Sequence, residues 1–231
     1  RRHAELMLEG LRRGYASRQS DGLRRFQQGV RFRQDVSNIR AALDWAVSSD
    51  GDAHLAIALT LAAAPYWLQL SMLGECMARI EQALPLVTGT DEASLRRRVA
   101  LLRPLASAEV FTSGPGGRAE AIWNEILAIA ETLDDGEWRL QALRGLWLNA
   151  LNRGAAREAL RTAERYRGVV TGSPPGLARL FGECMTGYAL HLMGDHEAAR
   201  SRFERMITGH QGAMHEPDML RSPVDQEIIA R

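Results

Sequence analysis

The feature that most constrains the fold of this chain is an internal repeat with a period of 40 residues. Four columns keep this spacing: a glycine column, an alanine column five positions later, and two columns of mostly apolar residues. Their members are Gly114, Gly154 and Gly194; Ala119, Ala159 and Ala199; Trp123, Ala163 and Phe203; and Ile126, Tyr166 and Met206. Because a single helical hairpin cannot bury its apolar stripe alone, such copies are expected to stack on one another.

A helical pattern covers almost all of the chain. Apolar residues recur every three or four positions in "IWNEILAIAETL" and "EWRLQALRGLWLNAL", and no stretch alternates in the manner of a β-strand. A fourth copy of the repeat precedes the others at a spacing of 43, with Cys76, Ile80 and Ala83 in its columns and Gly74 inside the start of its helix. The prediction is an all-α fold, a right-handed superhelical array of antiparallel hairpins in an α-solenoid. Pro65 and Pro104 lie inside helical patterns and predict a kink or an early helix end.

The turn signals predict one elongated domain with two parts. Residues 1–50 are expected to form a basic helical segment that packs on the repeats, and residues 51–231 to hold the repeats. The expected hairpins span about 52–88, 91–133, 135–171 and 175–211. The chain opens in "RRHAELMLEG" without an initiator Met and stops in "SPVDQEIIAR" as another helix begins, which predicts a piece of a longer protein. With no signal peptide and no membrane span, we expect it in the cytoplasm.

The residue inventory argues against several kinds of chemistry. All 29 basic residues are arginines, so the chain has no lysine for a Walker A loop or a Schiff base. Cys76 and Cys184 lie far apart without a metal-binding spacing and are expected to be reduced thiols. No nucleophile is paired with a base. We expect no enzyme activity, no catalytic residues, no cofactor and no binding of ATP.

Positive charge is concentrated at the N-terminal end. Residues 1–40 hold ten arginines and four acidic residues, whereas residues 41–231 hold nineteen and twenty-four. Such an end could contact nucleic acid or an acidic neighbouring domain, or it could be a solvated arginine-rich surface. The last interpretation is favoured, and no direct nucleic-acid binding is expected, because no aromatic residues interleave with the arginines to stack on bases.

His191, Asp195 and His196 lie within six residues and could surround a metal ion or a reacting group. The alternative is one hairpin, with His191 packed between helices and Gly194-Asp195 in the turn. Comparison of the copies favours the hairpin, since the column of His191 holds Phe111 and Leu151, which cannot bind a metal. No metal site is therefore expected. The five tryptophans are interpreted as mostly core residues.

The last copy resembles the tetratricopeptide repeat (TPR). It combines a small residue in the first helix, Gly187, with a Gly-Asp turn at Gly194-Asp195, a small residue at the helix crossing, Ala199, and an aromatic residue behind it, Phe203. The period of 40 is longer than the usual 34 or so residues of that family. The resemblance implies a TPR-like solenoid.

A second resemblance covers residues 32–87. This segment contains "NIRAALDWAV" with Trp45, a Gly-Asp turn at Gly51-Asp52, and the aromatic pair Tyr66-Trp67. It is similar to the region that follows the ATPase module in large bacterial transcriptional regulators, which also carry a winged-helix DNA-binding domain. The resemblance implies a protein-interaction or ligand-sensing arm attached to those domains. The alternative is a free-standing TPR-like scaffold in another assembly, without a signalling ligand.

In repeats of this kind the first helices line a concave face, and the resemblance implies which residues would lie there. They are Gln141, Arg144, Leu148, Asn152, Phe181, Tyr188 and His191. Such a mixed aromatic and polar surface would anchor a protein or peptide partner, or a small-molecule inducer. Alternatively, Leu148, Phe181 and Tyr188 simply pack against a neighbouring helix, because an aromatic stripe at helical spacing is more often core than binding surface.

Overall fold

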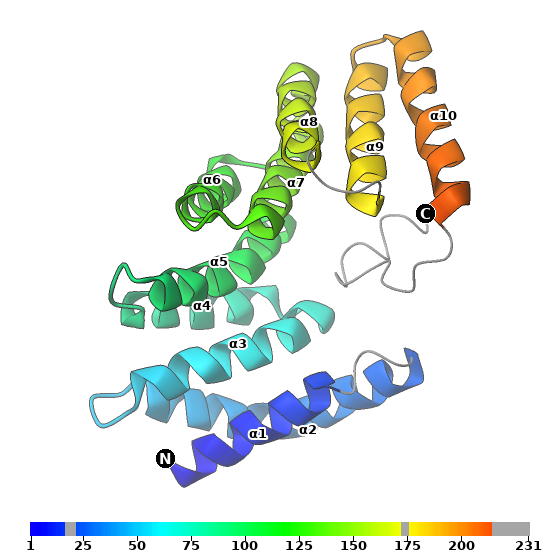
Figure 1. The fold of residues 1–231 in the computed structure, drawn as a ribbon. Helices are drawn as coiled ribbons and strands as arrows, with labels where there is room; N and C mark the ends of the chain where they lie inside the picture. Colours follow the sequence, from blue (N-terminus) through cyan, green and yellow to red (C-terminus); the bar gives the residue numbers. More distant parts are fainter. Residues whose placement is uncertain (17–21, 172–175, 214–231) are drawn as a thin grey trace. The chain divides into compact units, whose positions relative to one another are not determined.

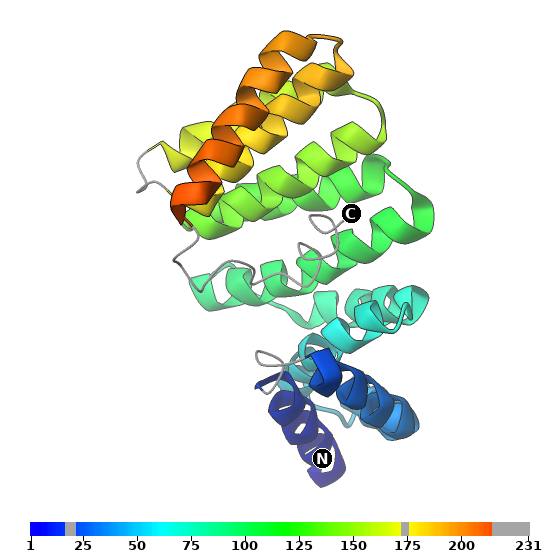
Figure 2. The ribbon, with the colours of Figure 1, turned by 90° about the vertical axis from the view of Figure 1, so that its right-hand side faces the viewer.

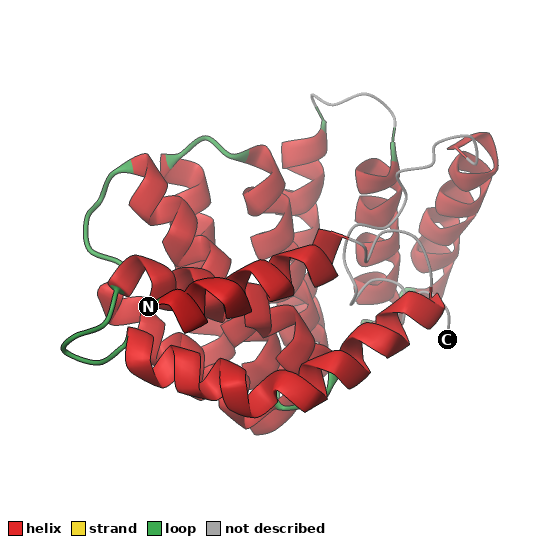
Figure 3. Ribbon diagram, turned by 90° about the horizontal axis from the view of Figure 1, so that it is seen from below, coloured by secondary structure: helices red, strands yellow, loops and turns green. Residues whose placement is uncertain are grey.

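A computed structural model describes the backbone of residues 1–16, 22–171 and 176–213, and the side chains of 1–13, 32–171 and 176–208. Within these ranges the chain forms helices and loops and no strand (Figure 3). The elements are α1 (Arg2–Ala16), α2 (Gly22–Ala46), α3 (Ala53–Gln69), α4 (Leu73–Ala83), the 3-10 turn η2 (Leu84–Leu86), α5 (Glu92–Ser113), α6 (Gly117–Thr132), α7 (Gly136–Asn152), α8 (Ala156–Val170), α9 (Leu177–Leu192) and α10 (His196–Ala213). The predicted all-α fold of paired helices is confirmed.

The helices gather into two compact units. Unit 1 is Arg1–Asp134 and contains α1 to α6, and unit 2 is Asp135–Arg231 and contains α7 to α10. The superhelical hand, the single elongated domain and the hairpin boundaries stay predictions. The expected junction between the third and fourth hairpins, at 172–175, and the expected helix start in "SPVDQEIIAR" lie outside the described residues.

Unit 1 is built on α3, which packs against α1, α2, α4 and α5 (Figure 1). The aromatic pair on α3 contributes to the contacts with α1 and α2. Phe32 of α2 stacks on Tyr66 with ring centroids 4.9 Å apart, and it meets Trp67 edge-on at 6.4 Å. The Tyr66 hydroxyl donates to the carbonyl of Leu11 in α1 at 3.3 Å. Tyr66 and Trp67 are therefore core residues that attach α1 and α2 to α3.

Part of the positive charge at the N-terminal end is paired inside unit 1. The Arg40 guanidinium of α2 donates through two nitrogens to the Glu75 carboxylate of α4. This interaction lowers the pKa of Glu75 below its ordinary value. Asp44, one turn after Arg40, accepts from Arg79, also on α4. The described ion pairs therefore hold α2 against α4, which is a structural role for charge at this end.

Unit 2 consists of two hairpins in which α7 packs on α8, α8 on α9 and α9 on α10. Figures 1 and 2 show α9 and α10 side by side and antiparallel. Ala159 and Ala199, from the alanine column, are buried in α8 and α10. A methyl group at these positions lets neighbouring helices approach closely, which explains why the last three copies keep alanine in this column.

The glycine column has a conformational cause. Gly114, Gly154 and Gly194 have φ of 78°, 71° and 84°, the left-handed region that a side chain disfavours. In the fourth copy the same place, 43 residues before Gly114, belongs to Ser71 with φ 57°. Ser71, and not the nearby Gly74, is therefore the equivalent residue, and Gly74 lies inside α4.

The two helical prolines do not end their helices. α3 continues past Pro65 to Gln69, and α5 continues past Pro104 to Ser113, so the early end allowed by the sequence is wrong. Each proline removes one backbone donor, but burial of the apolar residues that follow it, such as Trp67 and Leu105, holds the helix together.

The turn conformation predicts opposite effects of two substitutions. Gly154→Ala should lower the free energy of unfolding by about 1–2 kcal/mol, the cost of a left-handed alanine. The cost is conformational and not steric, because no heavy atom lies within 4 Å of the added Cβ. Ser71→Gly should raise the free energy of unfolding by about 0.5–1 kcal/mol by removing that strain. Urea unfolding measures both changes in the free energy of unfolding. Changes of the same sign in the two variants would contradict this explanation.

Candidate functional site

All seven residues of the predicted binding face lie on the first helices of the hairpins in unit 2. Gln141, Arg144, Leu148 and Asn152 belong to α7, and Phe181, Tyr188 and His191 belong to α9. Within each helix they are three, four or seven residues apart, so each set occupies one stripe. What the sequence does not specify is which side chains meet between the two helices.

Trp147 joins α7 to α9. Its ring meets Phe181 edge-on at 6.1 Å between centroids and Tyr188 edge-on at 6.2 Å. Its indole Nε1 donates to the Met185 carbonyl of α9 at 3.2 Å. The sequence predicts a core position for Trp147, and its side chain is indeed buried. It is also the residue that positions both aromatic members of the predicted face.

Tyr188 is held from both sides and remains 49% exposed. Besides Trp147, its ring meets Phe203 of α10 edge-on at 5.3 Å. The preceding residue, Gly187, allows this approach: a Cβ there would lie 2.8 Å from the Phe203 ring, well inside van der Waals contact. Tyr188 is therefore an exposed ring with little freedom to move.

Phe181 is half-buried and lies between the helices. It meets Tyr166 of α8 edge-on at 5.8 Å, in addition to Trp147. The Arg144 guanidinium carbon lies 6.0 Å from the Phe181 ring centroid, at the outer limit of a cation–π contact. Trp147, Tyr166, Phe181, Tyr188 and Phe203 together form what we call the aromatic cluster. The packing alternative describes Phe181 well, whereas Tyr188 presents half of its surface to solvent.

The other predicted residues lie outside the aromatic cluster. The Gln141 amide donates to Glu137 on its own helix at 3.1 Å. Leu148 is half-buried, and Asn152 is exposed at the end of α7. The structure thus places Phe181 and Tyr188 against Trp147 and Arg144 beside Phe181. Gln141, Leu148 and Asn152 are separate positions. The binding face as a whole stays a prediction.

The two histidines flank the last turn on the surface. His191 is exposed, so its expected packing between helices is wrong; its Nδ1 lies 3.2 Å from Nδ1 of His196. The Asp195 carboxylate accepts from the Ala198 backbone N–H at 3.1 Å and caps α10, and Gly194 makes the turn. Within the described part of the chain, no group of three or more His, Cys, Asp or Glu side chains is placed to hold a metal ion.

The two cysteines are free thiols with raised pKa values. Burial raises the pKa of Cys76 to about 12, and it also raises that of the half-buried Cys184. Because the thiolate is the reactive form, the raised pKa values make both side chains less reactive than an exposed thiol.

Comparison with protein-family models and with curated proteins gives no match. Solved structures, however, share the fold. One is a protein assigned as a kinesin light chain with nearly identical TPR-like repeats from Podosopora anserina, with a TM-score of 0.74 and 16% identity over 93% of this chain and 99% of that chain. Another is BtubC (BKLC) from P. vanneervenii, with a TM-score of 0.65 and 16% identity over 96% and 95% of the two chains.

These likenesses bear on the fold alone, because the identities are low. They confirm the predicted TPR-like helical repeat. They give no support to the bacterial regulator as the parent protein. Among the described helices, none combines the length and the apolar character that crossing a bilayer requires.

Proposed function

We propose that the chain is a non-enzymatic interaction module that binds a peptide segment of a protein partner along α7 and α9. The observation that carries the proposal is the half-exposed ring of Tyr188, which packs between Trp147 and Phe203. A ring already fixed by Trp147 and Phe203 loses little conformational entropy when a partner covers it, and aromatic residues of this kind dominate binding energy in many interfaces.

Exposed apolar side chains cluster beside Tyr188. Six large apolar residues of the described chain are exposed, and three of them, Tyr188, Leu192 and Met193, lie within six positions at the end of α9. Leu192 follows Tyr188 by four residues, so the two are neighbours on one face of the helix. A concentrated apolar patch favours a docking surface, whereas scattered exposed apolar residues would not.

The partner would place an apolar side chain against Tyr188 and Leu192. Arg144 lies beside Phe181, about two helical turns before Tyr188 along α9, and offers a planar cationic group for a carbonyl or carboxylate elsewhere on the bound segment. A small-molecule inducer is the second candidate ligand. A peptide is favoured because the patch is an exposed surface along a helix, whereas small ligands prefer deep and enclosed sites.

For the wider context, we propose the sensing arm of a cytoplasmic bacterial transcriptional regulator, with an ATPase and a winged-helix domain elsewhere in the parent chain. The resemblance of residues 32–87 supports this. A free-standing TPR-like scaffold fits the fold equally well. The sequence encoded upstream of Arg1 in the parent gene decides between them, since only the regulator requires an ATPase module there.

The peptide-binding proposal predicts the effect of two substitutions. Tyr188→Ala and Arg144→Ala should each weaken binding by about 1–3 kcal/mol, the usual range for interface anchors. The probe is a peptide selected from a phage-displayed random library on the full chain, measured by fluorescence anisotropy. The melting temperature should change little, because Tyr188 is half-exposed and Arg144 lies at the edge of the aromatic cluster.

Two further variants serve as controls for this experiment. Tyr188→Phe keeps the ring and should retain most of the affinity. Ile207→Ala removes an exposed apolar side chain of similar exposure from α10 of the same unit and should have no effect. Selected peptides that bind Tyr188→Ala and Arg144→Ala as tightly as the parent chain would show that the proposed face is wrong.

A further inference from the structure

The opposite side of α9 carries a second surface of different chemistry. Successive residues of a helix are about 100° apart, so Glu183 and Arg179 lie about 160–200° around α9 from Phe181. Arginines from both neighbouring helices converge on Glu183. Arg167 of α8 approaches its Oε1 at 3.3 Å, and Arg202 and Arg205 of α10 approach its Oε2 at 3.1 and 3.7 Å.

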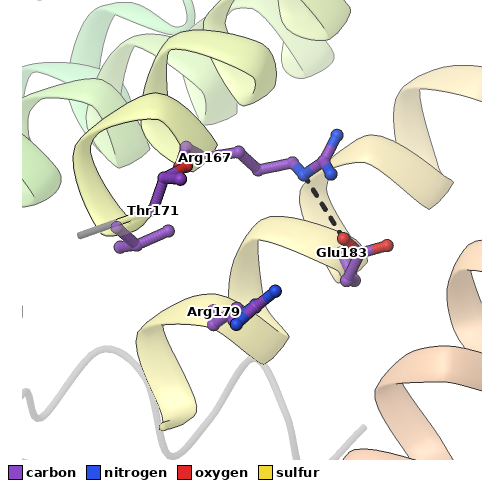
Figure 4. Close-up of a pocket in the computed structure, with 5 residues that line it drawn as sticks. Arg167, Thr171, Arg179 and Glu183 are labelled. Atoms are coloured by element: carbon purple, nitrogen blue, oxygen red, sulfur yellow. Dashed lines mark hydrogen bonds and ion pairs between the residues drawn. The ribbon is translucent and has the colours of Figure 1, made fainter. Parts of the chain in front are cut away.

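Arg179 completes this arrangement. It lies one turn before Glu183 on α9, and the two residues line a shallow pocket with Arg167, Val170 and Thr171 (Figure 4). Among the described residues Arg179 has no ion-pair partner. We call Arg167, Arg179, Arg202 and Arg205 the arginine patch.

Acidic residues do not balance the arginine patch. Glu183 is its only direct counter-charge among the described residues, and its side chain is 14% exposed. Glu164, one turn before Arg167, is a further nearby carboxylate on α8. Glu204 pairs with Arg200 at 2.7 Å, about 160–200° around α10 from Arg202. Four arginines thus face two carboxylates at most, which leaves an excess of two positive charges.

The excess is also an excess of hydrogen-bond donors. A guanidinium carries five N–H groups, whereas one carboxylate offers about four acceptor positions, so Glu183 cannot satisfy its three neighbours. Arg205 also donates to Ser201 on its own helix, whereas further N–H groups of Arg167, Arg179 and Arg202 remain for an additional anion. Arginine is the residue best suited to such contacts, because its planar donor pair matches the two oxygens of a carboxylate.

We propose that the arginine patch binds an acidic peptide segment of a protein partner, with one carboxylate entering the pocket between Arg167 and Arg179. Charge complementarity is the argument for this occupant. The site already accommodates one carboxylate, Glu183, between guanidinium groups. Nucleic acid fits less well, because the rings of α9 lie on the opposite face and cannot stack on bases. This surface is separate from the peptide face proposed above.

The test uses fluorescein-labelled hexaglutamate and the full 231-residue chain, followed by anisotropy at about 20 mM salt, where charge screening is weak. Arg179→Gln should weaken binding by about three- to tenfold. This variant breaks no ion pair of the described chain, so it should fold normally. Glu183→Gln should bind hexaglutamate about two- to tenfold more tightly, because it removes the internal competitor for the arginines. A purely structural ion-pair network predicts no such gain.

The matched control is Arg200→Gln, which removes an exposed arginine from the other side of α10 and should change binding less than about twofold. Tyr188→Ala should also leave hexaglutamate binding unchanged, so this test and that of the peptide face can fail separately. The proposal is overturned by absence of binding at low salt or by equal losses in Arg200→Gln and Arg179→Gln. Displacement by equimolar inorganic phosphate, or tighter binding of duplex DNA, would also overturn it.

Discussion

Replacing Trp147 by alanine is expected to lower the free energy of unfolding of unit 2 by about 3–5 kcal/mol, the usual cost of truncating a buried tryptophan. The loss combines a cavity between α7 and α9, two edge-on ring contacts, and the hydrogen bond to the Met185 carbonyl. Because whole domains are stable by only about 5–15 kcal/mol, unit 2 should be largely destabilised. Urea unfolding and amide hydrogen exchange of α7 and α9 measure this effect.

The same substitution should release Tyr188. Without Trp147 the ring loses one of its two supports, so peptide affinity should fall even under conditions in which unit 2 remains folded. Trp147→Phe separates the contribution of the ring contacts from that of the hydrogen bond, because it keeps an aromatic ring but removes the indole donor. If amide protection in α9 is unchanged in Trp147→Ala, then Trp147 is not what holds α7 against α9.

Replacing Trp67 by alanine is expected to cost unit 1 a similar amount, about 3–5 kcal/mol. Trp67 is fully buried in α3 and contacts Phe32 of α2. The resulting cavity would lie in the core that attaches α1 and α2 to α3. Amide exchange should accelerate in α2 and α3, and urea unfolding should report the total loss.

The two tryptophans should differ when each is replaced by phenylalanine. The Trp147 indole donates to a carbonyl, whereas the Trp67 Nε1 is buried without a hydrogen-bond partner among the described residues. Trp147→Phe therefore loses a hydrogen bond, worth about 0.5–1.5 kcal/mol, that Trp67→Phe does not lose. A larger loss for Trp67→Phe than for Trp147→Phe would contradict the assignment of that bond.

The repeat period was sufficient to predict the architecture. Columns 40 residues apart identified the hairpins, because helix pairing uses local contacts, and local contacts depend on spacing along the chain. The alanine column is buried where helices cross, and the glycine column has the left-handed turn conformation. Ser71 adopts the same conformation without being glycine, so the glycine column did not identify it as the turn residue of the fourth copy.

The candidate site was only partly accessible to sequence. The resemblance to TPR-like repeats implied that Arg144, Phe181 and Tyr188 share one face, and the structure places Phe181 and Tyr188 against Trp147 and Arg144 beside Phe181. The same reasoning could not tell that Phe181 is packed between helices while Tyr188 stays exposed, nor that His191 is on the surface. The exposure of a side chain depends on the neighbouring helices. The residues that pack on Tyr188 are Trp147, 41 positions before it, and Phe203, 15 positions after it.

Sequence alone determined the all-α class, the hairpin repeat and the stripe on each first helix, because these follow from periodicity within one or two helices. Tertiary structure decided which side chains meet across helices: Trp147 with Tyr188, and Arg167 and Arg202 with Glu183. The physical reason is that packing angle and rotation of each helix fix its side-chain partners, and both are set by the fit of whole helix surfaces.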